Sequence, residues 1–295
     1  MLTIFGVPAA AMAGQLVLGL INGAFYAMLS MGLAIIFGLL NIANFAHGAQ
    51  YMLGAFLAWM FLTYFDIGYW GALVLVPLAV GIIGILTERL LIARLKDADH
   101  LYGLLLTFGL ALVLQGGFSI IYGSSGMPYE IPALLSGGQR LGFMYVPNYR
   151  IWVVAASFAV CTMTWFTIER TKLGSYMRAA TENPGLSEAF GINVPLLVTL
   201  TYGIGTALAG FAGVLAAPIY QVNPAMGAEL LIVVFAVVVV GGMGSIAGSI
   251  VTGFVLGLIE AITKVYYPEG ASLVIFVIMI MVLMIKPAGI FGRTV

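Results

Sequence analysis

The 295-residue sequence is 62% hydrophobic and only 7% charged, whereas about a quarter of the residues in a soluble domain are charged. These few charges cannot cover a water-facing surface, so lipid is the expected solvent for most of the chain. Basic and acidic residues both number 11, which gives no basic surface for nucleic acid.

Long, continuous apolar runs dominate the sequence. A helix needs roughly 20 residues to cross the hydrocarbon core, and unpaired backbone groups are not tolerated in lipid, so we expect helices rather than strands. The sequence therefore predicts an all-α polytopic bundle forming a single transmembrane domain over 1–295. Its nine spans lie near 14–40, 48–65, 70–93, 101–121, 151–168, 196–217, 228–241, 246–264 and 271–286. The count becomes eight if a short segment, such as 228–241, is re-entrant.

The basic residues predict the orientation, because Lys and Arg are retained on the cytoplasmic side. If the spans alternate, eight of the eleven fall on one side: Arg89, Arg94, Lys96, Arg170, Lys172, Arg178, Lys286 and Arg293. The other three fall opposite: Arg140, Arg150 and Lys264. We therefore expect the N-terminus outside and the C-terminus inside a bacterial inner membrane.

Polar residues inside spans are costly and often mark a solute path. In the first span, Asn22 and Tyr26 are four residues apart and are candidates to face such a path. The densest polar cluster follows, between the first two spans. Either it is a turn joining two helices, or it is a broken helix that lines the path. Its members are Asn41, Asn44, His47 and Gln50.

Further along, single polar residues have two interpretations each. Gln115 either forms an interhelical hydrogen bond or faces the path. Glu229, near an outer mouth, is a candidate gate or contact for an external partner. Glu260 and Lys264 are four residues apart, so a local ion pair is expected. Only two histidines are present, His47 and His100, so we expect no metal site.

Two segments outside the spans stand out. The external one, 122–150, is rich in Gly and Pro and is either a connector or a landing surface for a partner. The internal one, 168–195, holds much of the charge of the chain. Ser175 can cap a helix that Asn183-Pro184 breaks, and Ser187 can cap a second one that Gly191 ends. Small apolar and charged positions alternate here in a way that suits a groove on a soluble partner.

The run from Arg178-Ala-Ala-Thr-Glu-Asn-Pro to Ala189-Phe-Gly-Ile-Asn193 resembles the coupling-helix signature of permeases in branched-chain amino acid ABC importers. Similar runs occur in order along the chain at 32–54, 203–213, 240–248 and 286–292, and the short N-terminus is similar to the LivH type. The resemblance implies that the internal segment docks an ATPase. The residues involved would be Arg178, Ala179, Glu182, Asn183, Leu186, Glu188, Ala189 and Gly191.

The resemblance also implies a heterodimer with a sister permease, two cytoplasmic ATPase subunits and a periplasmic solute-binding protein. The sequence has no Gly-x-x-x-x-Gly-Lys-Ser/Thr loop, so ATP would be used by the partner subunits and no cofactor is expected on this chain. No catalytic set is present among the spans. The expected solutes are branched-chain or other hydrophobic amino acids. The alternatives are urea, amides or aromatic acids, or an ion-coupled secondary transporter, for which Glu260 is the one deep carboxylate expected.

Overall fold

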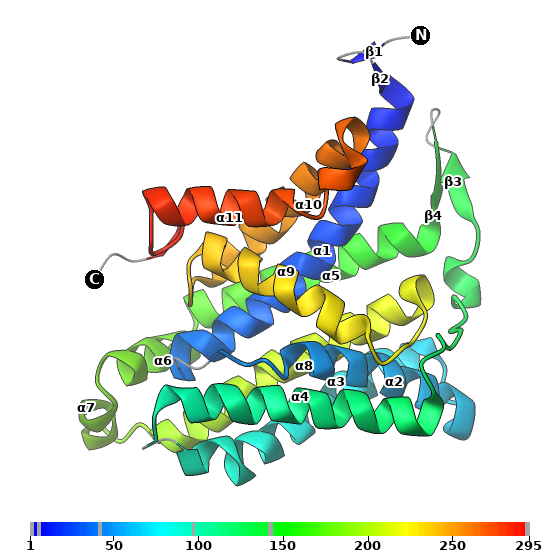
Figure 1. The fold of residues 1–295 in the computed structure, drawn as a ribbon. Helices are drawn as coiled ribbons and strands as arrows, with labels where there is room; N and C mark the ends of the chain where they lie inside the picture. The colour runs from blue at the N-terminus through cyan, green and yellow to red at the C-terminus, as the bar shows by residue number, and fades with distance from the viewer. Residues whose placement is uncertain (1–2, 5–6, 41–42, 96–97, 141–143, 293–295) are drawn as a thin grey trace.

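The computed structural model describes residues 3–4, 7–40, 43–95, 98–140 and 144–292, and these form a bundle of eleven α-helices (Figure 1). The prediction of an all-α bundle is confirmed. The helices are α1 (Ala9–Leu40), α2 (His47–Phe65), α3 (Tyr69–Leu90), α4 (His100–Tyr122), α5 (Asn148–Arg170), α6 (Lys172–Glu182), α7 (Pro184–Ala189), α8 (Val194–Tyr220), α9 (Met226–Gly241), α10 (Ile246–Tyr266) and α11 (Val274–Ile285).

Each of the nine predicted runs coincides with a helix, but not every helix has the length of a span. Six are long and apolar enough to cross a membrane: Ala9–Leu40, Tyr69–Leu95, Leu101–Tyr122, Asn148–Arg170, Val194–Tyr220 and Ile246–Tyr266. At 1.5 Å per residue, α9 is about 24 Å long and α11 about 18 Å, both shorter than a hydrocarbon core of about 30 Å. The count of eight or nine spans therefore stays a prediction.

Strands occur only outside the long helices in the described residues. Residues Thr3–Ile4 (β1) pair with Val7–Pro8 (β2), and Gly138–Arg140 (β3) pairs antiparallel with Tyr145–Pro147 (β4). The segment before β3 also contains a 3₁₀-helix, Ala133–Leu135, and a bridge from Met127 to Val222. Tyr129 is buried there, and burial raises its pKa to about 12. The segment thus packs against the bundle. Two further 3₁₀-helices are Ile92–Leu95 and Pro268–Gly270.

Small residues bring the central helices into close contact. Gly23 on α1 meets Gly257 on α10, and a Cβ added to Gly257 would lie 2.5 Å from the Cα of Gly23. One turn further along, Gly19 meets Ala261 in the same way. Lipid gives no hydrophobic drive for helix association, so close backbone approach of this kind is what holds such helices together. This seam fixes the relative positions of the α1 and α10 side chains.

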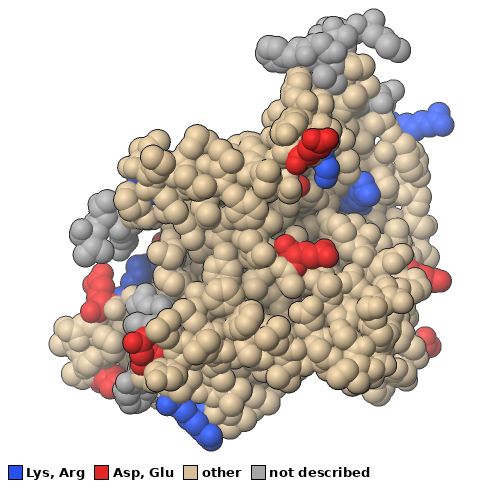
Figure 2. All heavy atoms as spheres, in the orientation of Figure 1, with Lys and Arg blue, Asp and Glu red and all other residues tan. Residues whose placement is uncertain are grey.

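The α6–α7 corner lies at one end of the bundle, and β3 and β4 lie at the other (Figure 1). Most of the surface between these ends is uncharged, as a lipid-facing surface should be (Figure 2). The same view shows a hollow near the middle of the face, with acidic and basic side chains at its edge. That hollow is the first place to look for a site, because charged residues are otherwise scarce.

Candidate functional site

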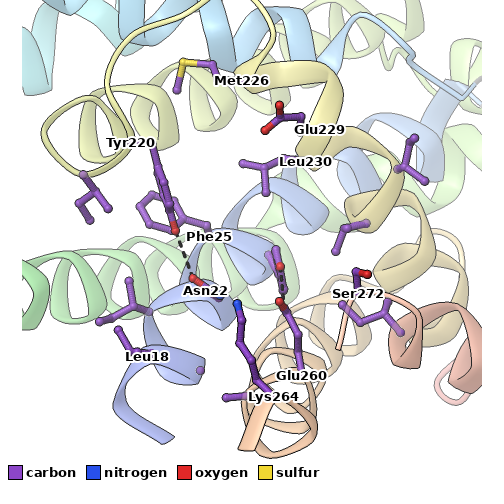
Figure 3. A pocket seen from close by; sticks show the side chains of 18 of the residues that line it. Leu18, Asn22, Phe25, Tyr220, Met226, Glu229, Leu230, Glu260, Lys264 and Ser272 are labelled. Carbon is purple, nitrogen blue, oxygen red and sulfur yellow. Dashed lines mark hydrogen bonds between the residues drawn. The ribbon is translucent and has the colours of Figure 1, made fainter. Parts of the chain in front are cut away.

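A cavity of about 840 Å³ opens between the N-terminal halves of α1 and α9 and the C-terminal half of α10 (Figure 3). Small-molecule sites occupy roughly 300–1,000 Å³, so this cavity has room for a small solute. Its polar lining consists of Gln15, Asn22, Tyr26, Tyr51, Arg150, Tyr220, Asn223, Glu229, Glu260, Lys264 and Ser272.

Two hydrogen bonds order the polar side of the cavity. The hydroxyl of Tyr26 donates to Oε2 of Glu260 at 2.8 Å, which joins α1 to α10. The hydroxyl of Tyr220 donates to Oδ1 of Asn22 at 3.1 Å, which joins α8 to α1 (Figure 3). Asn22 and Tyr26 are one turn apart on α1, so both reach the same cavity. The structure thus places these two predicted residues together.

Four charged side chains line the cavity: Arg150, Glu229, Glu260 and Lys264. The expected ion pair between Glu260 and Lys264 is wrong. The one ion pair within 4 Å among the described residues joins Arg178 to Glu169 at 3.5 Å, far from this cavity. Glu260 accepts the Tyr26 hydroxyl instead, because the α1–α10 seam brings that hydroxyl within reach. Two positive and two negative groups therefore face the cavity without a salt bridge between them.

The remaining walls are apolar. Phe25 and Tyr220 meet edge to face with their ring centroids 5.6 Å apart. Aliphatic and aromatic side chains from α1, α9 and α11 complete the surface, namely Leu18, Ile21, Met226, Leu230, Ile232, Val233, Ile275 and Phe276. Such walls favour an apolar group through burial, while the few polar groups fix its orientation.

The predicted cluster around the start of α2 lies away from the cavity. Nδ2 of Asn44 donates to Oε1 of Gln50 at 3.1 Å, and Nε2 of Gln50 donates to the hydroxyl of Tyr202 on α8 at 3.2 Å. Nε2 of His47 lies 3.0 Å from the carbonyl oxygen of Leu29 on α1. All of these side chains are buried, and none lines the cavity. They join three helices, and Asn41 lies outside the described residues.

Two other intramembrane polar residues, Gln115 and Glu88, lie away from the cavity. Gln115 is half-buried on α4 and does not line the cavity. The expectation that Glu260 is the one deep carboxylate is wrong, since Glu88 on α3 is only 4% exposed. Its Oε2 accepts the Thr199 hydroxyl from α8 at 2.6 Å. The sequence does not reveal Glu88 because it stands beside Arg89 at the end of a span, where charges are ordinarily solvated.

Segment 168–195 folds as two short helices separated at Asn183, as the sequence predicts, but the capping residues differ. The α6 helix already begins at Lys172, so Ser175 lies inside it. Asn183, not Ser187, caps α7 by accepting a hydrogen bond from the backbone N–H of Leu186 at 2.9 Å. After α7, Gly191 adopts a φ of 84°, the left-handed conformation that ends a helix.

The α6–α7 corner is exposed at its tip and attached at its base. The side chains of Leu186 and Phe190 are 55% and 80% exposed. Met177 and Ala180 are buried against the bundle, and the Thr181 hydroxyl donates to the carbonyl oxygen of Gly38 on α1 at 3.1 Å. Helix α1 thus contacts this corner near its C-terminal end, and it lines the cavity with Asn22 and Tyr26 nearer its N-terminal end.

A family profile described as "Branched-chain amino acid transport system / permease component" matches residues 15–283. The chain belongs to this family. Two relatives of this permease align along almost their whole length. It is 30% identical to the high-affinity branched-chain amino acid transport system permease protein LivH of Escherichia coli, and 31% identical to BraD of Pseudomonas aeruginosa. Each alignment covers 95% of both chains.

A second type of relative also matches the permease. It is 26% identical to the high-affinity branched-chain amino acid transport system permease protein LivM of Salmonella typhimurium, over 91% of this chain and 68% of the relative. No solved structure matches the chain. The relatives are permease subunits of transport systems rather than enzymes, and the permease is likewise a multi-pass membrane transporter subunit.

The sequence places Asn22, Tyr26 and Glu229 on a path, and all three line the cavity. It does not assign Arg150 or Lys264 to that site. The sequence does contain a signal for these two residues. They are two of the three basic residues that the predicted orientation places on the side opposite the other eight. A basic residue on the less basic side of a membrane protein has a weaker topological role, which leaves a role in the site as the alternative.

Proposed function

We propose that this chain is one of two permease subunits of an ATP-driven importer in a bacterial inner membrane. It forms half of the translocation path for branched-chain or other hydrophobic amino acids. The observation that carries the proposal is the cavity, whose apolar walls and separated charges suit a small apolar solute with polar ends. Membership of the family supports the same solute class.

The other subunits are proposed from the family and from what the sequence lacks. A sister permease of the LivM type would complete the path, and a periplasmic binding protein would deliver the solute. Two cytoplasmic ATPase subunits would bind and hydrolyse ATP, since this sequence has no phosphate-binding loop of its own. The chain itself would bind no cofactor.

A transport assay tests this assignment. The complete complex in proteoliposomes, with binding protein outside and ATP inside, is expected to accumulate leucine only when ATP is present. Uptake by this chain alone, driven by an ion gradient, would instead support a secondary transporter. Competition by urea, amides or aromatic acids more strongly than by isoleucine or valine would replace the proposed solute class with one of those.

The proposed topology has nine spans, with the N-terminus outside and the C-terminus inside. It places the cavity toward the periplasm and the α6–α7 corner in the cytoplasm. Single cysteines test it in a Cys161→Ala background, where Ser124→Cys and Ser175→Cys are both at exposed positions. A membrane-impermeant maleimide should label position 124 in intact cells and position 175 only after lysis. The reverse pattern would invert the topology.

The α6–α7 corner is the proposed ATPase-docking element. The residues assigned to it are Arg178, Ala179, Glu182, Asn183, Leu186, Glu188, Ala189 and Gly191. Support comes from the exposed apolar tip and from the Thr181 contact with α1, a route by which movement of the corner reaches the cavity. Such an element transmits ATP binding only if it has two positions of different ATPase affinity.

Replacing exposed leucines tests the docking claim. Leu186→Asp is expected to reduce co-purification of the ATPase at least about tenfold, because an unpaired carboxylate in an apolar interface is costly. Leu134→Asp is the matched control, since Leu134 is 81% exposed in the 3₁₀-helix that precedes β3 and lies outside the α6–α7 corner. Equal ATPase recruitment by both variants would remove α7 from the interface.

A further inference from the structure

The cavity keeps two opposite charges apart on different helices. Glu229 lies in the first turn of α9, and Lys264 lies in the last turn of α10. Figure 3 places these side chains on facing sides of the cavity. Neither forms an ion pair or a side-chain hydrogen bond with a described residue. Both charges therefore remain available to a solute, and each gains from one that supplies the opposite charge.

The groups around these two charges are already hydrogen-bonded in ways that favour one orientation of the solute. Glu260 accepts the Tyr26 hydroxyl at 2.8 Å, so part of its acceptor capacity is used. Asn22 accepts the Tyr220 hydroxyl through Oδ1, which leaves the amide N–H groups of Asn22 as donors. Lys264 and Asn22 lie on the same side of the cavity (Figure 3). That side thus offers an ammonium and an amide donor, the groups that bind a carboxylate.

Arg150 has a second environment. It lines the cavity, but it also borders an apolar groove of about 660 Å³ between α1, α5 and α10. Arg150 is therefore not confined to the cavity. Lys264 borders the cavity alone and faces Glu229 across it, which makes this pair the best candidate for two-point binding.

We infer that the permease cavity holds its solute as a zwitterion, with the carboxylate at Lys264 and Asn22 and the ammonium at Glu229. The inference rests on the proposed function and specifies how the cavity selects. An apolar side chain would then lie against Phe25, Leu230 and their neighbours. A neutral amide lacks both charges, and an aromatic acid lacks the ammonium, so each loses at least one of the two contacts.

Charge-neutral variants test the inference in the complete complex. Leucine uptake is measured in proteoliposomes with saturating leucine-loaded binding protein, and subunit co-purification is measured alongside. Glu229→Gln and Lys264→Gln should each reduce uptake at least about tenfold, because each leaves one charge of the solute unpaired. Subunit co-purification should be unchanged, which shows that the variants still assemble. The matched controls, Glu269→Gln and Arg140→Gln, neutralise exposed charges outside the cavity and should keep uptake within about twofold of wild type.

A charge exchange tests whether the two residues act as a pair. The double variant Glu229→Lys/Lys264→Glu keeps opposite charges on the two sides, so it should exceed either single variant in uptake at least about threefold. A double variant no better than the single ones overturns the paired assignment, as do single variants with uptake like the controls. A wild-type complex that assembles but takes up no leucine would count against the proposed function itself, which separates the two failures.

Discussion

Helices α1 and α4 have almost the same hydropathy and opposite surroundings. Their most apolar stretches are almost equally hydrophobic, yet 83% of that stretch is buried in α1 and only 6% in α4. Figure 1 shows α1 running through the bundle and α4 along its edge. Hydropathy reports preference for lipid over water, and a lipid-facing residue and a core residue have the same preference. It therefore predicts a span and not its place in the bundle.

The contacts of small residues distinguish these two helices. Gly19, Gly23 and Gly32 on α1 all meet backbone of other helices, whereas Gly116 and Gly117 on α4 have no neighbouring atom within 4 Å of an added Cβ. Two helices of similar composition thus have different places: the glycines of α1 pack inside the bundle, and those of α4 face outward. The surface of α4 is left for lipid or for another subunit.

Glycine substitutions should give the largest difference between the two helices. An added side chain at Gly257 meets the α1 backbone at 2.5 Å, so Gly257→Leu is expected to cost at least about 3 kcal/mol, the upper end for overpacking. Gly117→Leu meets open space and should change stability by less than about 0.5 kcal/mol. Thermal unfolding in detergent, followed by size-exclusion fluorescence, measures both. Equal unfolding temperatures would show that the α1–α10 seam does not hold the bundle together.

Replacing a glutamine by leucine in each helix region should give a smaller difference in stability between α4 and the buried cluster at α2, with the same chemical change at both sites. Gln50 is 3% exposed and hydrogen-bonded to both Asn44 and Tyr202, so Gln50→Leu leaves two buried polar groups unpaired and should cost about 1–3 kcal/mol. Gln115→Leu on α4 removes a half-buried amide and should be nearly neutral. The same unfolding measurement compares them. If Gln115→Leu is the more harmful in the assembled heterodimer, α4 contacts the sister subunit.

The sequence predicts the helices well because long apolar runs have one viable structure in lipid. Boundaries of 246–264 and 48–65 agree with α10 and α2 to within two residues. It also predicts the break at Asn183, since proline cannot continue a helix interior. The capping residue is harder to predict, because Asn183 and Ser187 are both good caps. The local signal that favours Asn183 is Pro184, since proline suits the first position of a helix.

The site is harder to predict, because its residues come from helices far apart in the sequence. Asn22 and Tyr26 are predicted from their spacing on one helix. The partner of Glu260 is Tyr26, 234 positions away, and no local rule favours it over Lys264, four positions away. The close packing of Gly23 on Gly257 decides that choice, and it requires knowing which helices touch.

Tyrosine substitutions should give the smallest difference between the two helices. Tyr26→Phe removes the hydrogen bond to Glu260, and interhelical hydrogen bonds of this kind contribute about 0.6–1.7 kcal/mol. Tyr102 on α4 is 57% exposed. Tyr102→Phe therefore removes a hydroxyl at the surface and should change stability by less than about 0.3 kcal/mol.

A double-mutant cycle sharpens the Tyr26 result. If Glu260 turns to Lys264 once the Tyr26 hydroxyl is gone, the new local pair recovers part of the lost stability. Lys264→Gln would then destabilise the Tyr26→Phe variant more than it destabilises wild type, by about 0.3–0.5 kcal/mol. Additive effects would show instead that Glu260 keeps its position without Tyr26, held by the α1–α10 seam alone. Either result separates the stability contributed by the Tyr26–Glu260 hydrogen bond from that contributed by the glycine contacts. Hydropathy does not distinguish these two contributions.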